Sequence, residues 1–181
     1  MKIGYNSPVV LTYAFAAAII VLVTETTGSS GLYVWFTSPS GSLNQPGEFL
    51  RLFSHVLGHS GWSQLTGNLT LMLLVGPLLE EKYGSFKIFE MFMITALVTG
   101  LINFFVFSAS VAGGTGLVFM LILLSSFANF KTGKIPLTLI LVALLFLGDE
   151  VLQSFNNNSA SGFSHLAGGV LGAIYGFMRI K

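Results

Sequence analysis

Six apolar segments take up most of the chain, and they constrain its fold more than any other feature of the sequence. Charged residues make up only 8% of the 181 residues, and all but Lys87 and Glu90 lie outside these segments. A soluble domain carries about 25% charged residues, and a helix that crosses a bilayer needs about 20 mostly apolar residues. The sequence therefore predicts an all-α integral membrane protein in contact with the lipid bilayer. The segments are residues 8–23, 63–79, 86–107, 115–130, 135–148 and 163–178.

The connections between the segments indicate one compact unit. A long connection, residues 24–62, contains Trp35 and Trp62, whose rings favour the membrane interface. An Asn-rich loop, residues 153–162, precedes the last segment. We find no internal repeat, so we predict a single transmembrane domain over residues 1–181.

Composition also limits the chemistry. The net charge of +1 provides no basic field for nucleic acid, and the absence of cysteine excludes disulfides, zinc-thiolate sites and a thiol nucleophile. His55 and His59 have the i, i+4 spacing of metal ligands, but no cysteine or converging carboxylate completes a set. We therefore expect no metal, no cofactor and no nucleic-acid partner.

The basic residues predict the orientation in the membrane. In a six-span arrangement seven of the eight Lys and Arg residues fall on one side, and only Arg51 falls on the other. The positive-inside rule then predicts a multi-pass protein with both termini in the cytoplasm. We expect the membrane to be the cell (plasma) membrane. The seven residues are Lys2, Lys82, Lys87, Lys131, Lys134, Arg179 and Lys181.

Three polar side chains share a depth in this arrangement. Asn68, Thr115 and His165 lie on the second, fourth and sixth segments, roughly 18 to 24 Å from the cytoplasmic ends of those helices. The irregular backbone expected at Gly113-Gly114 is tolerated at such depth only inside protein or beside water. The sequence therefore predicts a recessed polar cavity that opens to the outside.

Five short motifs resemble those of the rhomboid family of intramembrane proteases, in the same order and on the same spans. Gly113-Gly114-Thr115-Gly116 resembles the family's G-x-S-G motif, with Thr in the place of Ser. The resemblance covers about residues 51–176. The other matches are Arg51 of a Trp-Arg pair, His55, His59 and Asn68 of H-x-x-x-H…N, Gly76, Glu80 and Gly84 of G-x-x-x-E-x-x-x-G, and His165, Gly168 and Gly172 of H-x-x-G-x-x-x-G.

The resemblance implies a six-helix bundle and a serine-type endopeptidase that cleaves transmembrane segments of membrane proteins. Thr115 maps to the nucleophile and His165 to the general base, which a hydroxyl needs because it is a weak nucleophile at its free pKa. The residues mapped to the oxyanion or substrate region are His59, Gln64, Asn68, Gly114, Gly116 and Phe119. Those expected to be structural are Arg51, His55, Gly76, Glu80, Gly84, Gly168 and Gly172.

The sequence departs from the family pattern at four positions. The β-methyl of Thr115 restricts χ1 and crowds a site shaped for Ser. Gln64 stands where the family commonly has a third His, Leu50 replaces the Trp of the Trp-Arg pair, and Phe119 replaces a Tyr. Thr115 is compatible with a Thr-type protease, a natural inactive relative or an introduced substitution.

Other interpretations remain open. Thr115 alone would also suit the N-cap of a helix after a glycine loop. The main alternative function is a catalytically inactive rhomboid-like protein that binds transmembrane helices. A small transporter or channel is disfavoured, because no ring of charges and no inverted repeat is visible.

Overall fold

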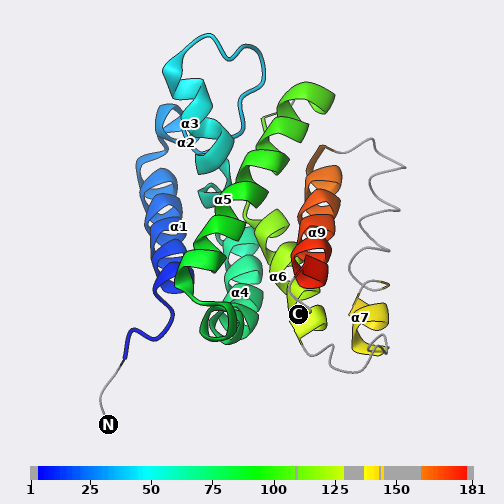
Figure 1. The fold of residues 1–181 in the computed structure, drawn as a ribbon. Coiled ribbons are helices and arrows are strands. Elements are labelled where there is room, and N and C mark those ends of the chain that lie inside the picture. The colour runs from blue at the N-terminus through cyan, green and yellow to red at the C-terminus, as the bar shows by residue number, and fades with distance from the viewer. Residues whose placement is uncertain (1–3, 109, 129–136, 143, 145–159, 179–181) are drawn as a thin grey trace.

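The computed structural model describes residues 4–108, 110–128, 137–142, 144 and 160–178, and the regular structure in these residues is helical (Figure 1). The expectation of an all-α protein is confirmed for this part of the chain. The helices are α1 (Pro8–Thr27), α2 (Ser30–Val34), α3 (Pro46–Ser54), the 3₁₀ turn η1 (His55–Leu57), α4 (Trp62–Tyr83), α5 (Ser85–Ile102) with its π-helical end η2 (Asn103–Phe107), α6 (Thr115–Ala128), α7 (Leu137–Val142) and α9 (Ala160–Met178).

Each predicted segment contains a helix, with some differences at the ends. Helix α1 continues four residues beyond the expected end and stops at Gly28, which has the left-handed conformation of a helix C-cap and donates its N–H to the Thr24 carbonyl. Two of the described helical stretches, Pro8–Thr27 and Ser85–Phe107, are long and apolar enough to cross a membrane. Residues 129–130, 135–136, 143, 145–148 and 153–159 of the predicted segments and loop lie outside the described residues, as do Lys2, Lys131, Lys134, Arg179 and Lys181.

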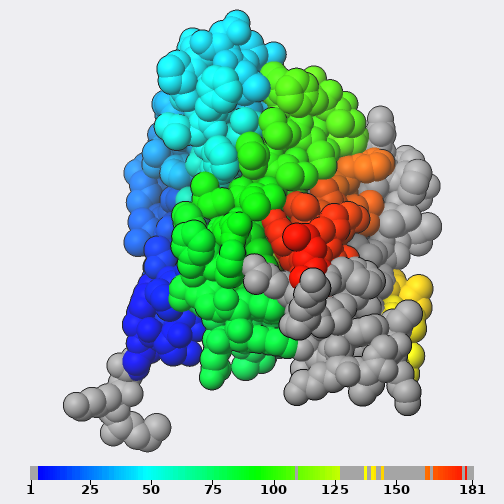
Figure 2. Space-filling model, viewed as in Figure 1, coloured from blue at the N-terminus to red at the C-terminus, as the bar shows by residue number. Residues whose placement is uncertain are grey.

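The main helices alternate in direction. Figure 1 shows α1 and α5 running one way, and α4, α6 and α9 running the other. The parallel course of these last three helices brings Asn68, Thr115 and His165 toward the same end of the bundle. The segment containing α2 and α3 covers that end beside α1 and α5 (Figure 2).

The start of α1 is anchored to α4 by a buried carboxylate. Pro8 has no N–H, the N–H groups of Val9 and Val10 donate to the two oxygens of Glu80 at 2.9 and 3.0 Å, and Leu11 donates to the carbonyl of Ser7 at 2.9 Å. The first N–H groups of an α-helix have no partner within the helix, so Glu80 satisfies those of Val9 and Val10, whereas the bond from Leu11 to Ser7 is the first regular i→i−4 bond. Glu80 is only 3% exposed, and its carboxylate accepts the hydrogen bonds that water would accept at an exposed helix start.

A glycine on α4 allows this close contact. Gly76 lies one turn before Glu80, and a Cβ built on Gly76 would lie 2.8 Å from the Val10 side chain. Gly84 ends α4 with φ at 85°, a conformation that L side chains rarely adopt. The predicted motif of Gly76, Glu80 and Gly84 thus coincides with the packing of α4 on α1 and with the turn into α5.

The first connection is held by Arg51 of α3. Its guanidinium donates to the carbonyls of Thr37 and Ser38, to the Thr37 hydroxyl and to the Glu48 carboxylate, at 2.7 to 3.1 Å. Ser38 in turn bonds Val111 twice, through its N–H at 2.8 Å and its Oγ at 2.9 Å. The folded connection therefore supports the segment that leads into Gly113.

We expect Glu80→Ala to lower the free energy of unfolding by about 2–4 kcal/mol, because it leaves two N–H groups at the start of α1 without their acceptor. The apparent Tm of the purified protein in detergent would report the loss. Glu81→Ala is the matched control, since Glu81 is exposed on the same turn. Equal Tm values for the two variants would contradict the anchoring role.

Candidate active site

Thr115 and Asn68 meet between α6 and α4. Thr115 is the first residue of α6, and its Oγ1 lies 3.2 Å from both Nδ2 and Oδ1 of Asn68. The hydroxyl can therefore donate to the amide oxygen or accept from the amide nitrogen. Asn68 is 7% exposed, so this pair forms in a sheltered environment.

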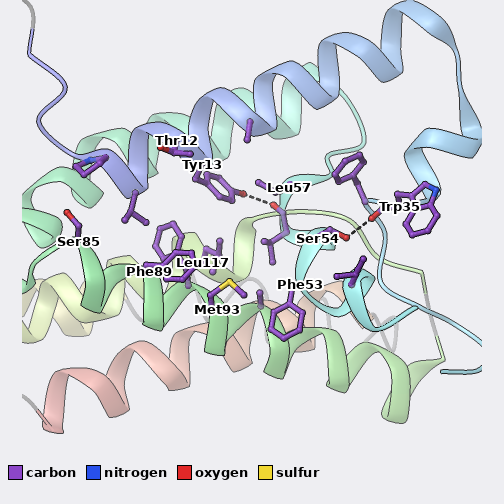
Figure 3. A pocket seen from close by; sticks show the side chains of 18 residues that line it. Thr12, Tyr13, Trp35, Phe53, Ser54, Leu57, Ser85, Phe89, Met93 and Leu117 are labelled. Carbon is purple, nitrogen blue, oxygen red and sulfur yellow. Dashed lines mark hydrogen bonds between the residues drawn. The ribbon is translucent and has the colours of Figure 1, made fainter. Parts of the chain in front are cut away.

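The loop before Thr115 rests on η1 and α1. Gly113 has φ at 146°, which favours glycine, and its N–H donates to the His55 carbonyl at 3.0 Å. A Cβ on Gly114 would overlap the hydroxyl oxygen of Tyr13, which itself donates to the Val56 carbonyl at 2.6 Å (Figure 3). Both glycines are thus required by their surroundings, one by its φ angle and the other by close contact.

Gln64 reaches the same loop from α4. It lies one turn before Asn68, and its Nε2 donates to the Ala112 carbonyl at 3.4 Å. Its Nε2 also lies 2.8 Å from the position that a Cβ on Gly113 would take. Gln64, at the position where the rhomboid resemblance implies a histidine, therefore borders the glycine loop.

His165 stacks on Phe119, one turn along α6 from Thr115. The two ring centroids are 5.7 Å apart and the ring planes are inclined by 21°. This contact brings His165 of α9 to the end of α6 that carries Thr115.

Two glycines let α9 approach α6 backbone to backbone. A Cβ on Gly168 would overlap the Gly116 carbonyl oxygen, and a Cβ on Gly172 would overlap that of Met120. Small residues at i, i+4 spacing permit this kind of close helix packing in membranes. The glycines of the predicted H-x-x-G-x-x-x-G motif thus set the distance between the helices that carry His165 and Thr115.

The two histidines of the first connection are buried and bonded locally. The Thr99 hydroxyl donates to the Thr95 carbonyl at 2.8 Å, so it accepts from Nε2 of His55 at 3.2 Å. Burial lowers the pKa of His55 to about 4, against the smaller opposing effect of backbone hydrogen bonds. His55 is therefore neutral at pH 7 and joins η1 to α5.

His59 has the opposite tautomer. Its Nδ1 lies 3.2 Å from the Leu57 carbonyl, which only accepts, so Nδ1 carries the hydrogen and Nε2 carries the lone pair. Burial lowers the pKa of His59, and its backbone hydrogen bond opposes that shift in part. In this tautomer His59 does not offer a donor at Nε2.

A separate apolar cavity of about 800 Å³ lies between α1, the α2–α3 segment and α5 (Figure 3). Tyr13, Val56 and Leu117 line it, whereas Thr115, Asn68 and His165 are not among its described lining residues. We assign it no part in the chemistry at Thr115.

The sequence-predicted residues thus fall into two groups. The first surrounds the start of α6, and the second lies elsewhere, with Arg51 in the first connection and Gly76, Glu80 and Gly84 at the far end of α4. The first group comprises Gln64, Asn68, Gly114, Thr115, Gly116, Phe119, His165, Gly168 and Gly172, with His55 beside the loop. His59 lies in the turn between η1 and α4, where it contacts Leu57.

Comparison with known proteins identifies the family. The Rhomboid domain family profile matches residues 46–181. The chain belongs to the rhomboid family. Rhomboids are integral membrane proteins and include intramembrane serine proteases.

Three curated rhomboids are similar to this chain. The Rhomboid protease GlpG of Haemophilus influenzae is 23% identical over 145 residues, which cover 76% of this chain and 73% of that protein. Rhomboid-related protein 1 of Caenorhabditis elegans is 27% identical over 73% of this chain and 40% of its own length. The Rhomboid protease GluP of Bacillus subtilis is 29% identical over 94% of this chain and 34% of its own length. The chain thus spans less than half of the last two proteins.

Sequence reasoning missed two residues at this rhomboid site. Tyr13 lies against Gly114, and Ser60 bonds the side chain of Gln64. A lone tyrosine within an apolar segment and a serine four residues before a glutamine are the only signals that the sequence offers for them.

We expect Gly172→Ala to lower stability by about 1–3 kcal/mol, because its methyl group would force α9 away from the Met120 carbonyl. Gly67→Ala is the matched control, since a Cβ on Gly67 has no neighbour within 4 Å among the described residues. The apparent Tm in detergent measures both. A Gly172→Ala protein as stable as the control would contradict the close packing of α6 and α9.

The neutral state of His55 predicts a loss of stability in acid. The unfolded chain takes up a proton near pH 6.5 and the folded chain only near pH 4, so stability falls as the pH decreases through this window. By pH 4 the loss attributable to His55 approaches about 3 kcal/mol. We expect His55→Gln to flatten the pH dependence of the apparent Tm, and an unchanged slope would contradict the prediction.

Proposed function

We propose that this rhomboid is an intramembrane endopeptidase that cleaves transmembrane segments of membrane proteins with a Thr115–His165 dyad. The observation that carries the proposal is the position of the Thr115 hydroxyl. It follows the glycine loop, contacts the buried Asn68 amide, and lies one turn from the ring on which His165 stacks.

The proposed reaction is acyl transfer. Thr115 Oγ1 attacks the carbonyl carbon of the scissile peptide bond while His165 accepts the hydroxyl proton. The tetrahedral intermediate collapses to an ester on Thr115, and the amine leaves with the proton from His165. Water then attacks the ester, again with His165 as the base, and restores the free hydroxyl.

The carbonyl oxygen needs hydrogen-bond donors as it becomes negative. Gln64 Nε2, Asn68 Nδ2 and the N–H of Thr115 are the donors in this proposal. One such donor in a site shielded from water is typically worth about 3 kcal/mol to the transition state. Because His59 bears its hydrogen on Nδ1, we give it a supporting role at the edge of the site.

The proposal includes the topology expected from the sequence. Six spans in a single domain would place both termini in the cytoplasm of a cell (plasma) membrane, with a recessed polar cavity open to the outside above Thr115. The alternating directions of the main helices support this arrangement (Figure 1). A substrate helix would unwind locally at the cavity, because a helical peptide bond is shielded from attack.

One observation favours an alternative, a catalytically inactive rhomboid that binds transmembrane helices. Both polar atoms of the Asn68 amide lie 3.2 Å from Thr115 Oγ1, and the β-branched side chain has few other χ1 positions. A hydroxyl held in this way is less able to turn toward a substrate. A small misplacement of a reacting atom can reduce a rate by about 100-fold.

Cleavage of a transmembrane substrate by purified protein in liposomes tests the proposal. We expect Thr115→Ser to cleave about 10- to 100-fold faster than the parent, because the β-methyl group is removed. We expect Thr115→Ala and His165→Ala to be inactive while keeping the parent's apparent Tm.

The outcomes separate the two functions. Slow cleavage by the parent that requires Thr115 and His165 supports the Thr-type protease. Cleavage only after Thr115→Ser, with substrate binding retained by the parent, supports the inactive helix-binding protein. Absence of cleavage by both the parent and Thr115→Ser would falsify the protease assignment.

A further inference from the structure

The side chain of Gln64 is held at both ends. Its Oε1 lies 2.8 Å from the backbone N–H of Ser60 and 3.1 Å from the Ser60 hydroxyl, and its Nε2 lies 3.4 Å from the Ala112 carbonyl. Ser60 is exposed in the turn before α4, whereas Ala112 precedes the glycine loop. Gln64 therefore links two connections that are far apart in the sequence.

The chemistry of these partners allows one orientation of the amide. A backbone N–H only donates, so the atom that faces Ser60 has to be the oxygen. A carbonyl only accepts, so the atom that faces Ala112 has to be the nitrogen. In the exchanged orientation the amide N–H would face the backbone N–H of Ser60, and the amide oxygen would face the carbonyl of Ala112.

This orientation keeps an amide N–H beside the glycine loop, close to Thr115. The position that a Cβ on Gly113 would occupy is 2.8 Å from Gln64 Nε2 and 3.8 Å from Thr115 Oγ1. The absence of a side chain on Gly113 therefore lets the Gln64 amide pack against the loop on the side where Thr115 lies. A donor held there is placed to serve the oxyanion that develops next to the attacking hydroxyl.

We infer that Ser60 is a positioning residue for the reaction: it holds the Gln64 amide so that Nε2 donates to the oxyanion that develops beside Thr115. One N–H of the amide serves Ala112, and the second serves the substrate. The inference rests on the proposed protease function, and it explains how an uncharged glutamine takes the place of a histidine. Of the two bonds from Ser60 to Gln64 Oε1, a substitution of Ser60 can remove only the one from the hydroxyl, since every replacement other than proline keeps the backbone N–H.

A role in starting α4 is the simpler alternative. Gln64 is the third residue of α4, and a glutamine there often bonds an N–H just before the helix. Such a cap would affect stability without any specific effect on the rate of the chemical step. The experiment therefore has to measure the amide itself as well as kcat and KM.

Selective ¹⁵N labelling of glutamine side chains provides the first measurement, since the chain contains only Gln45, Gln64 and Gln153. The signal of Gln64 is assigned by its loss in Gln64→Leu. We expect slow hydrogen exchange of this amide in the parent, faster exchange in Ser60→Ala, and slow exchange again in Ser60→Thr, which keeps the hydroxyl. Equal exchange in the parent and Ser60→Ala overturns the inference, whether or not the protein cleaves a substrate.

Kinetics in the Thr115→Ser background provide the second measurement. We expect Ser60→Ala to lower kcat about three- to tenfold with little change in KM, and Ser60→Thr to restore it. In a Gln64→Leu background Ser60→Ala should have no further effect on kcat, because no amide remains to be oriented. An equal loss of kcat in both backgrounds, or a loss of Tm without a change in kcat, overturns the positioning role. Absence of cleavage by every variant together with a hydroxyl-dependent Gln64 amide overturns the proposed protease function, but not the orientation of the amide by Ser60.

Discussion

A polar group inside an apolar bundle needs a hydrogen-bond partner within the protein. On α4, one i, i+4 ridge of side chains provides such partners near both ends of the helix. Near the start of α4, Gln64 and Asn68 bond the glycine loop and the Thr115 hydroxyl. Near its end, Gly76 and Glu80 receive the first turn of α1. An i, i+4 ridge winds slowly around a helix. The same ridge can therefore face α6 at one end and α1 at the other.

Close backbone contacts also position the residues of the candidate site. The glycines of α9 let its backbone touch that of α6, and the stack of Phe119 and His165 follows from this contact. Around Gly113 and Gly114 the neighbours are a carbonyl, a tyrosine hydroxyl and an amide. Polar partners and small residues thus act together, because directed hydrogen bonds at the loop need helices that are held at a short and constant distance.

Much of the fold and part of the site could be predicted from the sequence. Apolar length locates the helices of the six segments but not the short helices α2 and α3 of the first connection. Counting residues to the helix ends places Thr115, Asn68 and His165 toward one end of the bundle. The contact of Tyr13 with Gly114 and the bond between Ser60 and Gln64 could not be predicted. They depend on how α1 leans against η1 and on the course of a turn, and neither leaves a periodic pattern. The end of α1 lies four residues beyond the predicted one, because the helix continues through polar residues as far as the Gly28 cap.

The contact between α1 and the glycine loop makes α1 part of the structure that supports the candidate site. The family profile starts at residue 46 and so leaves out α1 entirely. Yet α1 contributes Tyr13 to the underside of the loop, and it is fastened to α4 through Glu80. The profile is therefore shorter than the part of the chain that supports the candidate site, although the match to GluP covers 94% of the chain. A chain trimmed to residues 46–181 would retain every motif residue while losing the helix that packs against the glycine loop.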